Sequence, residues 1–362
     1  MSNNGLLFIP DISGFTKFVN ETEIEHSRYI IGELLENIIN SNKIGLTISE
    51  VEGDAVLFYR FGSTPLLKEI YGQVESMFCN FQKQLKNYES RRACQCSACI
   101  AAVNLSLKVI THHGEFSTYN VQNYNKLIGK DVIVAHQLLK NNIDLHEYWL
   151  VTNNLFNLNP TGTDLPAWMN WQHGNKQTDK GDVAFQYSML SQLKEKVYAD
   201  PITNLELPDN KVKAISQKKT IDIPSITLLS VIGNLSLRPK WVEGIQSVDQ
   251  SSHPINHVGV KHHFVFDCRK MVFYNSSFSQ NNDTFYCSET DEKKTIGVYF
   301  TLTPLSDNQT LIVIDCYMKK NPFMELFFHL FMKNKLSLQL AQSLENLQAL
   351  CKQPGVGYPK PL

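Results

Sequence analysis

The stretch Leu6-Leu7-Phe8-Ile9-Pro10-Asp11-Ile12-Ser13-Gly14-Phe15-Thr16 decides the fold of the first half of the chain. Its consecutive apolar residues predict a short strand that is buried on both faces. The strand ends at Asp11, and the chain then turns at Gly14 and enters a helix. A carboxylate beside the main-chain amides of a helix start can hold a divalent cation and a phosphate together. The stretch therefore predicts a site for a metal ion and a phosphate group.

A second acidic stretch, residues 48–59, predicts two strands joined by a turn at Gly53-Asp54. If this hairpin lies beside the first strand, Asp11 and Asp54 share one site. Two carboxylates at short distance repel each other unless a cation lies between them. The pair therefore predicts a bound divalent cation, Mg²⁺ or Mn²⁺.

The sequence Asp-Ile-x-Gly-Phe-Thr, followed by a Gly-Asp hairpin, resembles the class III nucleotidyl cyclases, in a divergent form of a bacterial type. The resemblance implies that Mg²⁺ or Mn²⁺ is held at Asp11, Ile12 and Asp54. It also implies that the triphosphate of a purine nucleotide is held by Gly14, Phe15 and Thr16. The expected partner is therefore a purine nucleotide.

The resemblance continues through residues 105–114, 127–138 and 148–152, and it covers about residues 5–190. It implies an α+β fold with a ferredoxin-like βαββαβ core. Glu50 and Lys126 stand at the positions that select the purine base in this family, although they complete neither known pair. Cyclase sites form between two chains, so the resemblance also implies a homodimer.

The departures from the family pattern bear on catalysis. Active cyclases support the transition state with an asparagine and an arginine, where this chain has Ile133 and Gln137. Isoleucine donates no hydrogen bond, and glutamine carries no charge. Losing a charged group aimed at a developing phosphate charge typically lowers a rate by a factor of hundreds or more. Metal binding is therefore favoured more strongly than cyclisation.

Length and composition set the broad class. The chain has 362 residues, a net charge of −1 and a hydrophobic fraction of 43%. This length suggests two domains, which we place at residues 1–192 and 211–355 with a linker at 193–210. The net charge offers no overall attraction to nucleic acid or to an anionic membrane. We find neither a signal peptide nor a membrane span, so we expect a cytoplasmic location.

The second domain is expected to begin with a strand and two short helices, continue as an antiparallel run, and end in a long helix over residues 322–351. This order is similar to the helix-grip fold of START-like, polyketide-cyclase-like (SRPBCC) proteins. The resemblance implies an apolar small molecule held between the sheet and the long helix. Candidate wall residues, which could equally fill the core, are Trp241, Phe264, Phe266, Tyr299, Phe327 and Phe331.

A cysteine cluster, Cys94-x-Cys96-x-x-Cys99, precedes the strand at residues 105–114. Three thiolates at this spacing can bind one Zn²⁺ or an iron–sulfur cluster, with a fourth ligand from elsewhere. A structural zinc site usually shows two paired motifs, and this chain shows one. Reduced core cysteines and a redox-active pair are the competing interpretations.

Three functions remain open at this point. The favoured one is a small-molecule-sensing or signalling protein whose cyclase-like domain binds metal and nucleotide but has lost its chemistry. The second is an active, divergent cyclase that converts a purine nucleoside triphosphate to a cyclic nucleotide and pyrophosphate. The third is a carrier of lipids or aromatic ligands, in which the first domain is a scaffold.

Overall fold

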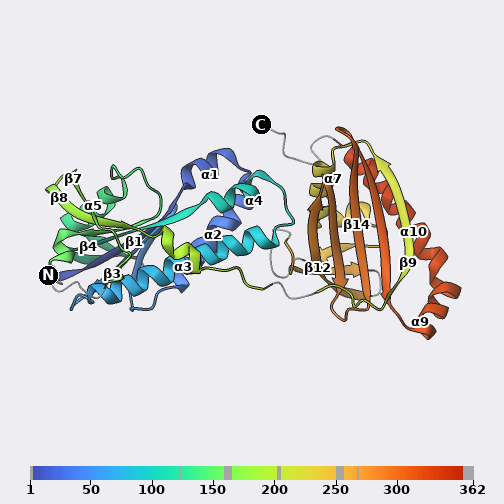
Figure 1. The fold of residues 1–362 in the computed structure, drawn as a ribbon, viewed down its shortest axis with the longest axis horizontal. Coiled ribbons are helices and arrows are strands. Elements are labelled where there is room, and N and C mark those ends of the chain that lie inside the picture. The colour runs from blue at the N-terminus through green and yellow to red at the C-terminus, as the bar shows by residue number, and fades with distance from the viewer. Residues whose placement is uncertain are drawn as a thin grey trace. The chain divides into compact units, whose positions relative to one another are not determined.

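The computed structural model describes residues 3–122, 124–158, 165–201, 205–249, 257–266 and 269–353. It divides into two compact units, shown from blue to green and from yellow to red in Figure 1. The first unit is Met1–Asn87 with Ala101–Asp200, and the second is Tyr88–Ile100 with Pro201–Leu362. The domain expected at residues 1–192 includes residues 88–100, which the structure groups with the second unit.

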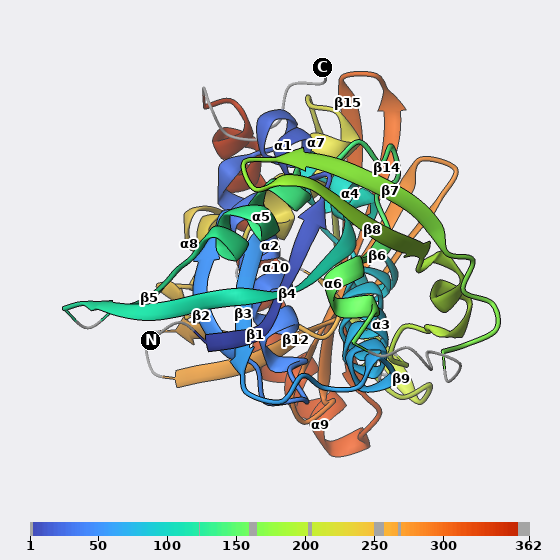
Figure 2. The same ribbon diagram turned by 90° about the vertical axis from the view of Figure 1, so that its left-hand side faces the viewer.

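The first unit is built on one mixed sheet with the strand order β2-β3-β1-β4-β6-β8-β7. The central strand β1 pairs antiparallel with β3 and β4, and β4 pairs parallel with β6. A further strand, β5, pairs with the end of β4, and this ribbon projects from the sheet in Figure 2. The strands are β1 (Asn3–Ser13), β2 (Thr47–Glu52), β3 (Ala55–Phe61), β4 (Ser106–Val121), β5 (Tyr124–Ile128), β6 (Tyr148–Thr152), β7 (Gln172–Thr178) and β8 (Gly181–Met189).

The helices of the first unit cover both faces of β1, which explains the continuous apolar sequence of that strand. Leu7 and Ile9 belong to a core that includes Val134 and Leu138 of α5. The alternate residue Phe8 faces the other side and packs edge to face with Phe58. The helices are α1 (Phe15–Glu21), α2 (Ile24–Asn40), α3 (Leu67–Arg91), α5 (Lys130–Leu139) and α6 (Asn153–Phe156).

Residues 153–180, which the sequence suggests are a surface excursion, contain two regular elements in their described part. These are α6 and the strand β7, which pairs along its length with β8. The sequence of β7, Gln-His-Gly-Asn-Lys-Gln-Thr, lacks apolar alternation because β7 is the last strand of the sheet order. Its main chain hydrogen-bonds to one neighbour, so few of its side chains need to be buried.

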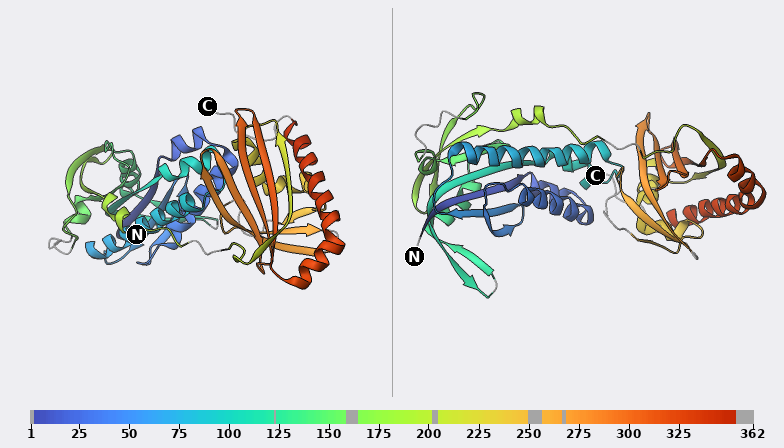
Figure 3. Two further views of the ribbon diagram at one scale, coloured as in Figure 1. Left: turned by 45° about the vertical axis from the view of Figure 1, so that its right-hand side comes forward. Right: turned by 90° about the horizontal axis from the view of Figure 1, so that it is seen from below.

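The second unit is an antiparallel sheet of seven strands in the order β10-β11-β12-β13-β14-β15-β9. Helices α7 (Ser225–Gly233), α8 (Arg238–Trp241) and α10 (Lys333–Cys351) pack against it, as Figures 1 and 3 show. A five-residue helix, α4 (Ser97–Ala101), begins in the cysteine segment. The strands are β9 (Lys211–Ile221), β10 (Ser247–Asp249), β11 (Lys261–Phe266), β12 (Arg269–Asn281), β13 (Thr284–Asp291), β14 (Ile296–Ser306) and β15 (Gln309–Lys319).

The long helix expected at residues 322–351 is interrupted. It consists of α9 (Pro322–Phe327), one π-helical turn at Phe328–Met332, and α10. Asn321 caps α9 by accepting hydrogen bonds from two main-chain amides with its side chain. Leu344, Leu347 and Leu350 of α10 lie in the core with strands β14 and β15, whereas most apolar residues before α10 are exposed. In the described part of the chain, no helix is long and apolar enough to cross a membrane.

Candidate functional site

The first unit contains a cavity of about 950 Å³. It is bounded by the end of β1, the start of α1, the β2–β3 turn and one face of α5. Its lining includes nine residues of interest, namely Asp11, Ile12, Ser13, Gly14, Phe15, Thr16, Glu50, Asp54 and Lys108. The structure therefore brings together the two acidic motifs that the sequence singles out.

The pairing of β1 with β3 sets the positions of the two aspartates. Asp11 lies opposite Ala55, the first residue of β3. Asp54 belongs to the turn just before it, where Gly53 adopts a φ of +61°. The amide of Ile12 donates a hydrogen bond of 3.0 Å to the main-chain oxygen of Asp54, which fixes the turn against the strand end. The side chain of Ile12 is fully buried, so only its main chain can serve a ligand.

Asp11 is an unusual carboxyl group because it is only 8% exposed. The pKa of Asp11 is raised to about 6. Burial is the largest cause, the charge of Lys108 lowers the pKa, and the nearby charge of Asp54 raises it. Burial also raises the pKa of Asp54. The Nζ atom of Lys108 lies 3.6 Å from the Asp11 carboxylate, and it donates to the main-chain oxygen of Leu139 at 3.3 Å. Two carboxyl groups are thus held in one cavity with a single lysine close to Asp11.

The turn into α1 supplies the other groups of the cavity. Gly14 has a φ of +90°, a conformation that side chains rarely adopt, and this turn directs Phe15 and Thr16 into the lining. The hydroxyl group of Ser13 is buried and has no hydrogen-bond partner among the described residues. A buried hydroxyl group without a partner is costly in a folded protein, so it favours a ligand at this position.

Glu50 and Lys126 meet in an ion pair, although they lie on different strands, β2 and β5. Glu50 lines the cavity, and the Nε2 atom of His136 lies 3.8 Å from its other carboxylate oxygen. Ligand atoms of Glu50, Glu52 and His136 lie within 4.8 Å of one another, so this rim is a second place where a cation could bind.

Ile133 and Gln137 also line the cavity, on the face of α5. The side-chain amide of Gln137 donates a hydrogen bond of 2.8 Å to the Asp179 carboxylate. Its oxygen accepts one of 3.2 Å from the main-chain amide of Asp179. These bonds tie Gln137 to the β7–β8 turn. Of the two lining residues on this face, one therefore has a side chain that cannot hydrogen-bond, and the other has a side chain that is already engaged.

Among the cavity residues that the sequence analysis did not single out are Ser13 and Lys108. The signal for Lys108 was present, because it is the one charged residue in the stretch 105–110, where the only other polar residue is Ser106. A charged residue in a buried strand needs a partner, and here that partner is Asp11.

A buried network beside the cavity includes His112. Its ring contacts the Thr152 hydroxyl through Nδ1 and the Asp131 carboxylate through Nε2, both at 2.9 Å. Burial would raise the pKa of Asp131, but hydrogen bonds from His112 and Lys180 hold it below its usual range. His112 is therefore a structural residue that joins β4, β6 and α5.

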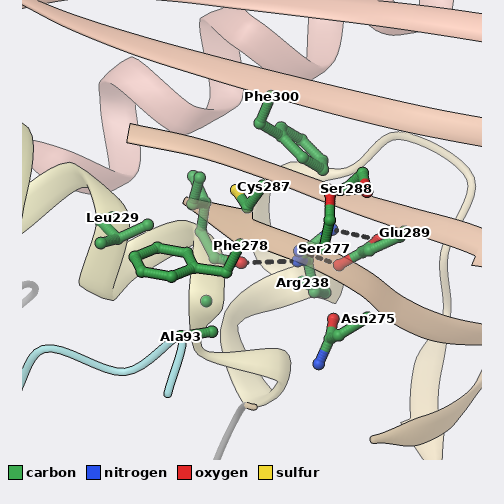
Figure 4. A pocket seen from close by; sticks show the side chains of 12 residues that line it. Ala93, Leu229, Arg238, Asn275, Ser277, Phe278, Cys287, Ser288, Glu289 and Phe300 are labelled. Carbon is green, nitrogen blue, oxygen red and sulfur yellow. Dashed lines mark hydrogen bonds and ion pairs between the residues drawn. The ribbon is translucent and has the colours of Figure 1, made fainter. Parts of the chain in front are cut away.

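Figure 4 shows a small cavity of the second unit, with a volume of about 20 Å³. This is the volume of a single water molecule and is too small for an apolar ligand. Arg238 and Glu289 form a buried ion pair in its lining, and Figure 4 shows their side chains meeting between the helix and the sheet.

The six aromatic residues proposed as an apolar pocket do not surround one space. Trp241 and Phe264 are buried core residues, and Phe266 packs beside Phe264. Tyr299 faces away from the core that holds its neighbour Phe300, and its ring packs on Tyr317. The structure also differs from the prediction at Phe327 and Phe331, which are exposed because the helix is interrupted before it reaches the core.

The cysteine segment is attached to the second unit by main-chain contacts. The amide of Val258 donates to the oxygen of Arg91 at 2.8 Å, and Arg92 forms a β-bridge with His257. The sulfur atoms of Cys94, Cys96 and Cys99 lie within 4.8 Å of one another. The structure therefore brings together the three cysteines that the sequence grouped.

Comparison with known proteins gives two matches in sequence. A family model described as "Protein of unknown function (DUF2652)" matches residues 31–148. The uncharacterized protein Rv2561/Rv2562 of Mycobacterium tuberculosis is 32% identical over 124 residues, which are 34% of this chain and 57% of that protein. The match therefore spans little more than half of this relative. The family model includes Asp54 but begins after Asp11.

Similar solved structures are cyclase domains. The catalytic core of a rhodopsin-guanylyl cyclase in complex with ATPαS has a TM-score of 0.39 at 12% identity, over 52% of this chain and 97% of that one. The adenylyl cyclase CyaB from P. aeruginosa has a TM-score of 0.36 at 17% identity, over 52% and 94%. The guanylate cyclase domain of RhGC from Catenaria anguillulae has 0.37 at 13%, over 52% and 98%.

Proposed function

We propose that the first unit binds a purine nucleoside triphosphate together with Mg²⁺ or Mn²⁺ and does not cyclise it efficiently. The observation that carries this proposal is the cavity of about 950 Å³ in which Asp11 and Asp54 converge beside the unpartnered Ser13 hydroxyl. A cavity of this size suits a nucleotide. A protein that binds a nucleotide without consuming it is suited to report its concentration, which agrees with a sensing or signalling role.

The donor set suits a hard divalent cation. Mg²⁺ and Mn²⁺ prefer oxygen ligands, which Asp11, Asp54 and the main chain of Ile12 offer. A bound cation would neutralise the buried carboxylate of Asp11, the partly buried carboxylate of Asp54 and part of the phosphate charge of the nucleotide. Gly14, Phe15 and Thr16 would hold the phosphates, and lysines of the lining would balance the remaining charge, namely Lys17, Lys108 and Lys140.

The loss of cyclisation follows from Ile133 and Gln137. Neither presents a charge to the developing phosphate charge of the transition state, and Gln137 is bonded to Asp179. The ion pair between Glu50 and Lys126 would contact the purine base and leave the choice between adenine and guanine open. A second copy of the chain could complete the site, in keeping with a homodimer, and a cytoplasmic location would supply the nucleotide.

The carrier function is less favoured for the second unit. Its helices and antiparallel sheet support the helix-grip interpretation, but the proposed aromatic wall is dispersed between core, far face and surface. The cavity of about 20 Å³ beside Arg238 would have to widen before it could hold an apolar ligand.

The test is isothermal titration of the full chain with non-hydrolysable ATP and GTP analogues in Mn²⁺. We expect binding to depend on Mn²⁺ and to be lost in the Asp11→Ala, Asp54→Ala double variant. Glu36→Gln is the matched control, since it removes an exposed carboxylate of α2 that does not line the cavity. Loss of binding in Glu36→Gln alone, or no binding by the unaltered chain, would overturn the proposal.

A further inference from the structure

We propose that Cys94, Cys96 and Cys99 bind one zinc ion as thiolates, at a site distinct from the nucleotide cavity. Their sulfur atoms lie within 4.8 Å of one another. Thiolates about 2.3 Å from one zinc ion lie about 3.8 Å from each other, so small side-chain movements would bring all three onto one ion. Among the described residues, none of the cysteines forms a disulfide bond.

The local main chain supports thiolate ligands. The amide of Cys99 donates a hydrogen bond of 3.4 Å to the sulfur of Cys96. Amide donation to sulfur stabilises the negative charge of a thiolate ligand, as hydrogen bonds to other charged forms do. Cys96 and Cys99 are buried, and α4 begins between them, so the loop has a fixed course from one sulfur to the next.

The position of the loop gives the ion a structural role. Its preceding residues, Arg91 and Arg92, are bonded to the start of the second unit's β11 region at Val258 and His257. A zinc ion would hold closed a loop that contributes to the second unit from a distant point of the sequence. A fourth ligand would complete the tetrahedron that closed zinc sites show.

The test measures the metal content of the full chain purified under reducing conditions. We expect about one zinc ion per chain, lost in the Cys94→Ser, Cys96→Ser variant. It should be retained in two controls, the Cys287→Ser, Cys316→Ser variant, which alters other cysteines of the second unit, and the Asp11→Ala, Asp54→Ala variant. These controls separate this proposal from the nucleotide site, so that either can fail alone.

A second readout does not depend on folding of the cysteine variant. Cobalt added to the unaltered, zinc-depleted chain should give intense near-ultraviolet bands from thiolate-to-cobalt charge transfer, and a mercurial reagent should abolish them. No zinc and no such bands would overturn the proposal. A disulfide between these cysteines in the purified, unreduced chain, with no bound metal, would also overturn it and favour a redox pair.

A separate observation concerns the exposed apolar residues of α9 and the following π-helical turn. We infer that this segment docks on an anionic lipid surface. Phe323 is 86% exposed, Leu330 67% and Phe331 70%, and Met324, Leu326 and Phe327 are also exposed. At helical spacing, residues 323, 326, 327, 330 and 331 share one face. An apolar patch of this density is unusual on a protein surface unless something covers it.

The charges around the patch indicate what covers it. Four exposed lysines flank it, Lys319, Lys320, Lys333 and Lys335. Glu325 is the one acidic residue between residues 316 and 344, and its carboxylate accepts from the amide of Asn321. A helix with an aromatic face and lysines at its ends suits a membrane interface with anionic headgroups. The overall charge of −1 gives no such attraction, so the binding would be local.

The test is flotation of the full chain with vesicles of phosphatidylcholine alone or with about one third phosphatidylglycerol. We expect binding to the mixed vesicles that weakens in high salt. Leu330→Ser with Phe331→Ser should weaken it about a hundredfold, because two large apolar side chains are withdrawn from the interface. Leu305→Ser, at another exposed apolar residue of the second unit, should leave it unchanged.

Absence of binding to both kinds of vesicle would overturn this inference. So would equal binding of the Leu330→Ser, Phe331→Ser variant. Concentration-dependent dimers without vesicle binding, lost in the same variant, would show that a second copy of the chain covers the patch.

Discussion

The function proposed for the first unit depends most on the carboxyl group of Asp11. Two roles are open to Asp11. It pairs with Lys108 and does nothing else, or it pairs with Lys108 and also binds a metal ion. In the first case the aspartate is already satisfied. In the second, the lysine only partly compensates the buried carboxylate of Asp11 and the partly buried carboxylate of Asp54, and a cation completes the balance.

The Lys108→Met substitution separates these interpretations. Without metal it should destabilise the chain by about 1–3 kcal/mol, because Asp11 loses its partner in a buried position. Mn²⁺ should then raise the melting temperature of this variant more than that of the unaltered chain. Lys180→Met is the control, since Lys180 pairs with Asp131 outside the cavity lining. A variant that Mn²⁺ fails to stabilise would support the ion pair as the sole role.

His262 makes a prediction about pH. It is fully buried between Phe264 and Phe273, and neither ring nitrogen has a hydrogen-bond partner among the described residues. Burial lowers the pKa of His262 to about 4 from an ordinary 6.5, although the charge of Glu289 opposes the shift. Because the folded pKa is depressed, its contribution to stability is present above pH 6.5 and is lost as the pH falls through 4.

The loss amounts to about 3 kcal/mol between these limits. The His262→Phe variant should therefore keep more of its stability at acid pH than the unaltered chain does, as measured by urea unfolding across this range. His263→Gln is the control, because His263 points to the opposite face and is only half-buried. Parallel pH profiles for His262→Phe and the unaltered chain would contradict the prediction.

At the scale of elements, the contact of β4 with α5 depends on a glycine. A Cβ atom at Gly114 would lie 2.2 Å from the side chain of Asp131, within the network that also binds His112. We expect Gly114→Ala to cost about 3 kcal/mol of unfolding free energy, because strand and helix must move apart.

Gly72 in α3 is the matched comparison, since a Cβ atom at this position would meet no other side chain or strand within 4 Å. Alanine there should stabilise the chain by about 0.5–1 kcal/mol through helix propensity. Thermal unfolding of the two variants gives both values. Equal effects of the two substitutions would contradict the proposed contact between β4 and α5.

The elements also show what the sequence could predict. The β1 stretch and the β2–β3 turn were found because burial on two faces and a Gly-Asp turn leave strong local signals. β5 and β7 were missed, since each pairs along one edge and carries polar residues. The π-helical turn before α10 was missed as well, because the apolar spacing of residues 322–351 continues through it without a glycine or a proline.

The candidate site was predictable in part for a similar reason. Asp11, Gly14 and Asp54 belong to short motifs, and pairing of neighbouring strands brings these motifs together. The hydrogen bond between Gln137 and Asp179 joins residues far apart in sequence, so no local sequence pattern predicts it. The six aromatic residues of the expected apolar pocket lie apart, because aromatic residues on strands and on a helix fit a core, a far face or an exposed patch equally well.

At the scale of the whole molecule, the two units have separate cores. We expect two unfolding transitions in calorimetry of the full chain. Leu150→Ala, fully buried in the first unit, should lower one midpoint, and Leu347→Ala, fully buried in the second, should lower the other. Each substitution should cost about 2–5 kcal/mol. A single transition that both substitutions shift alike would contradict independent units.

The first unit is proposed to hold a metal-bound nucleotide without cyclising it. The most direct measurement incubates the full chain with radiolabelled ATP and GTP in Mn²⁺ and separates cyclic nucleotide from intact triphosphate. We expect bound, intact triphosphate and no more cyclic product than the Asp11→Ala, Asp54→Ala variant forms. Many turnovers to cyclic nucleotide, lost in that variant, would contradict it and show that Ile133 and Gln137 do not prevent catalysis.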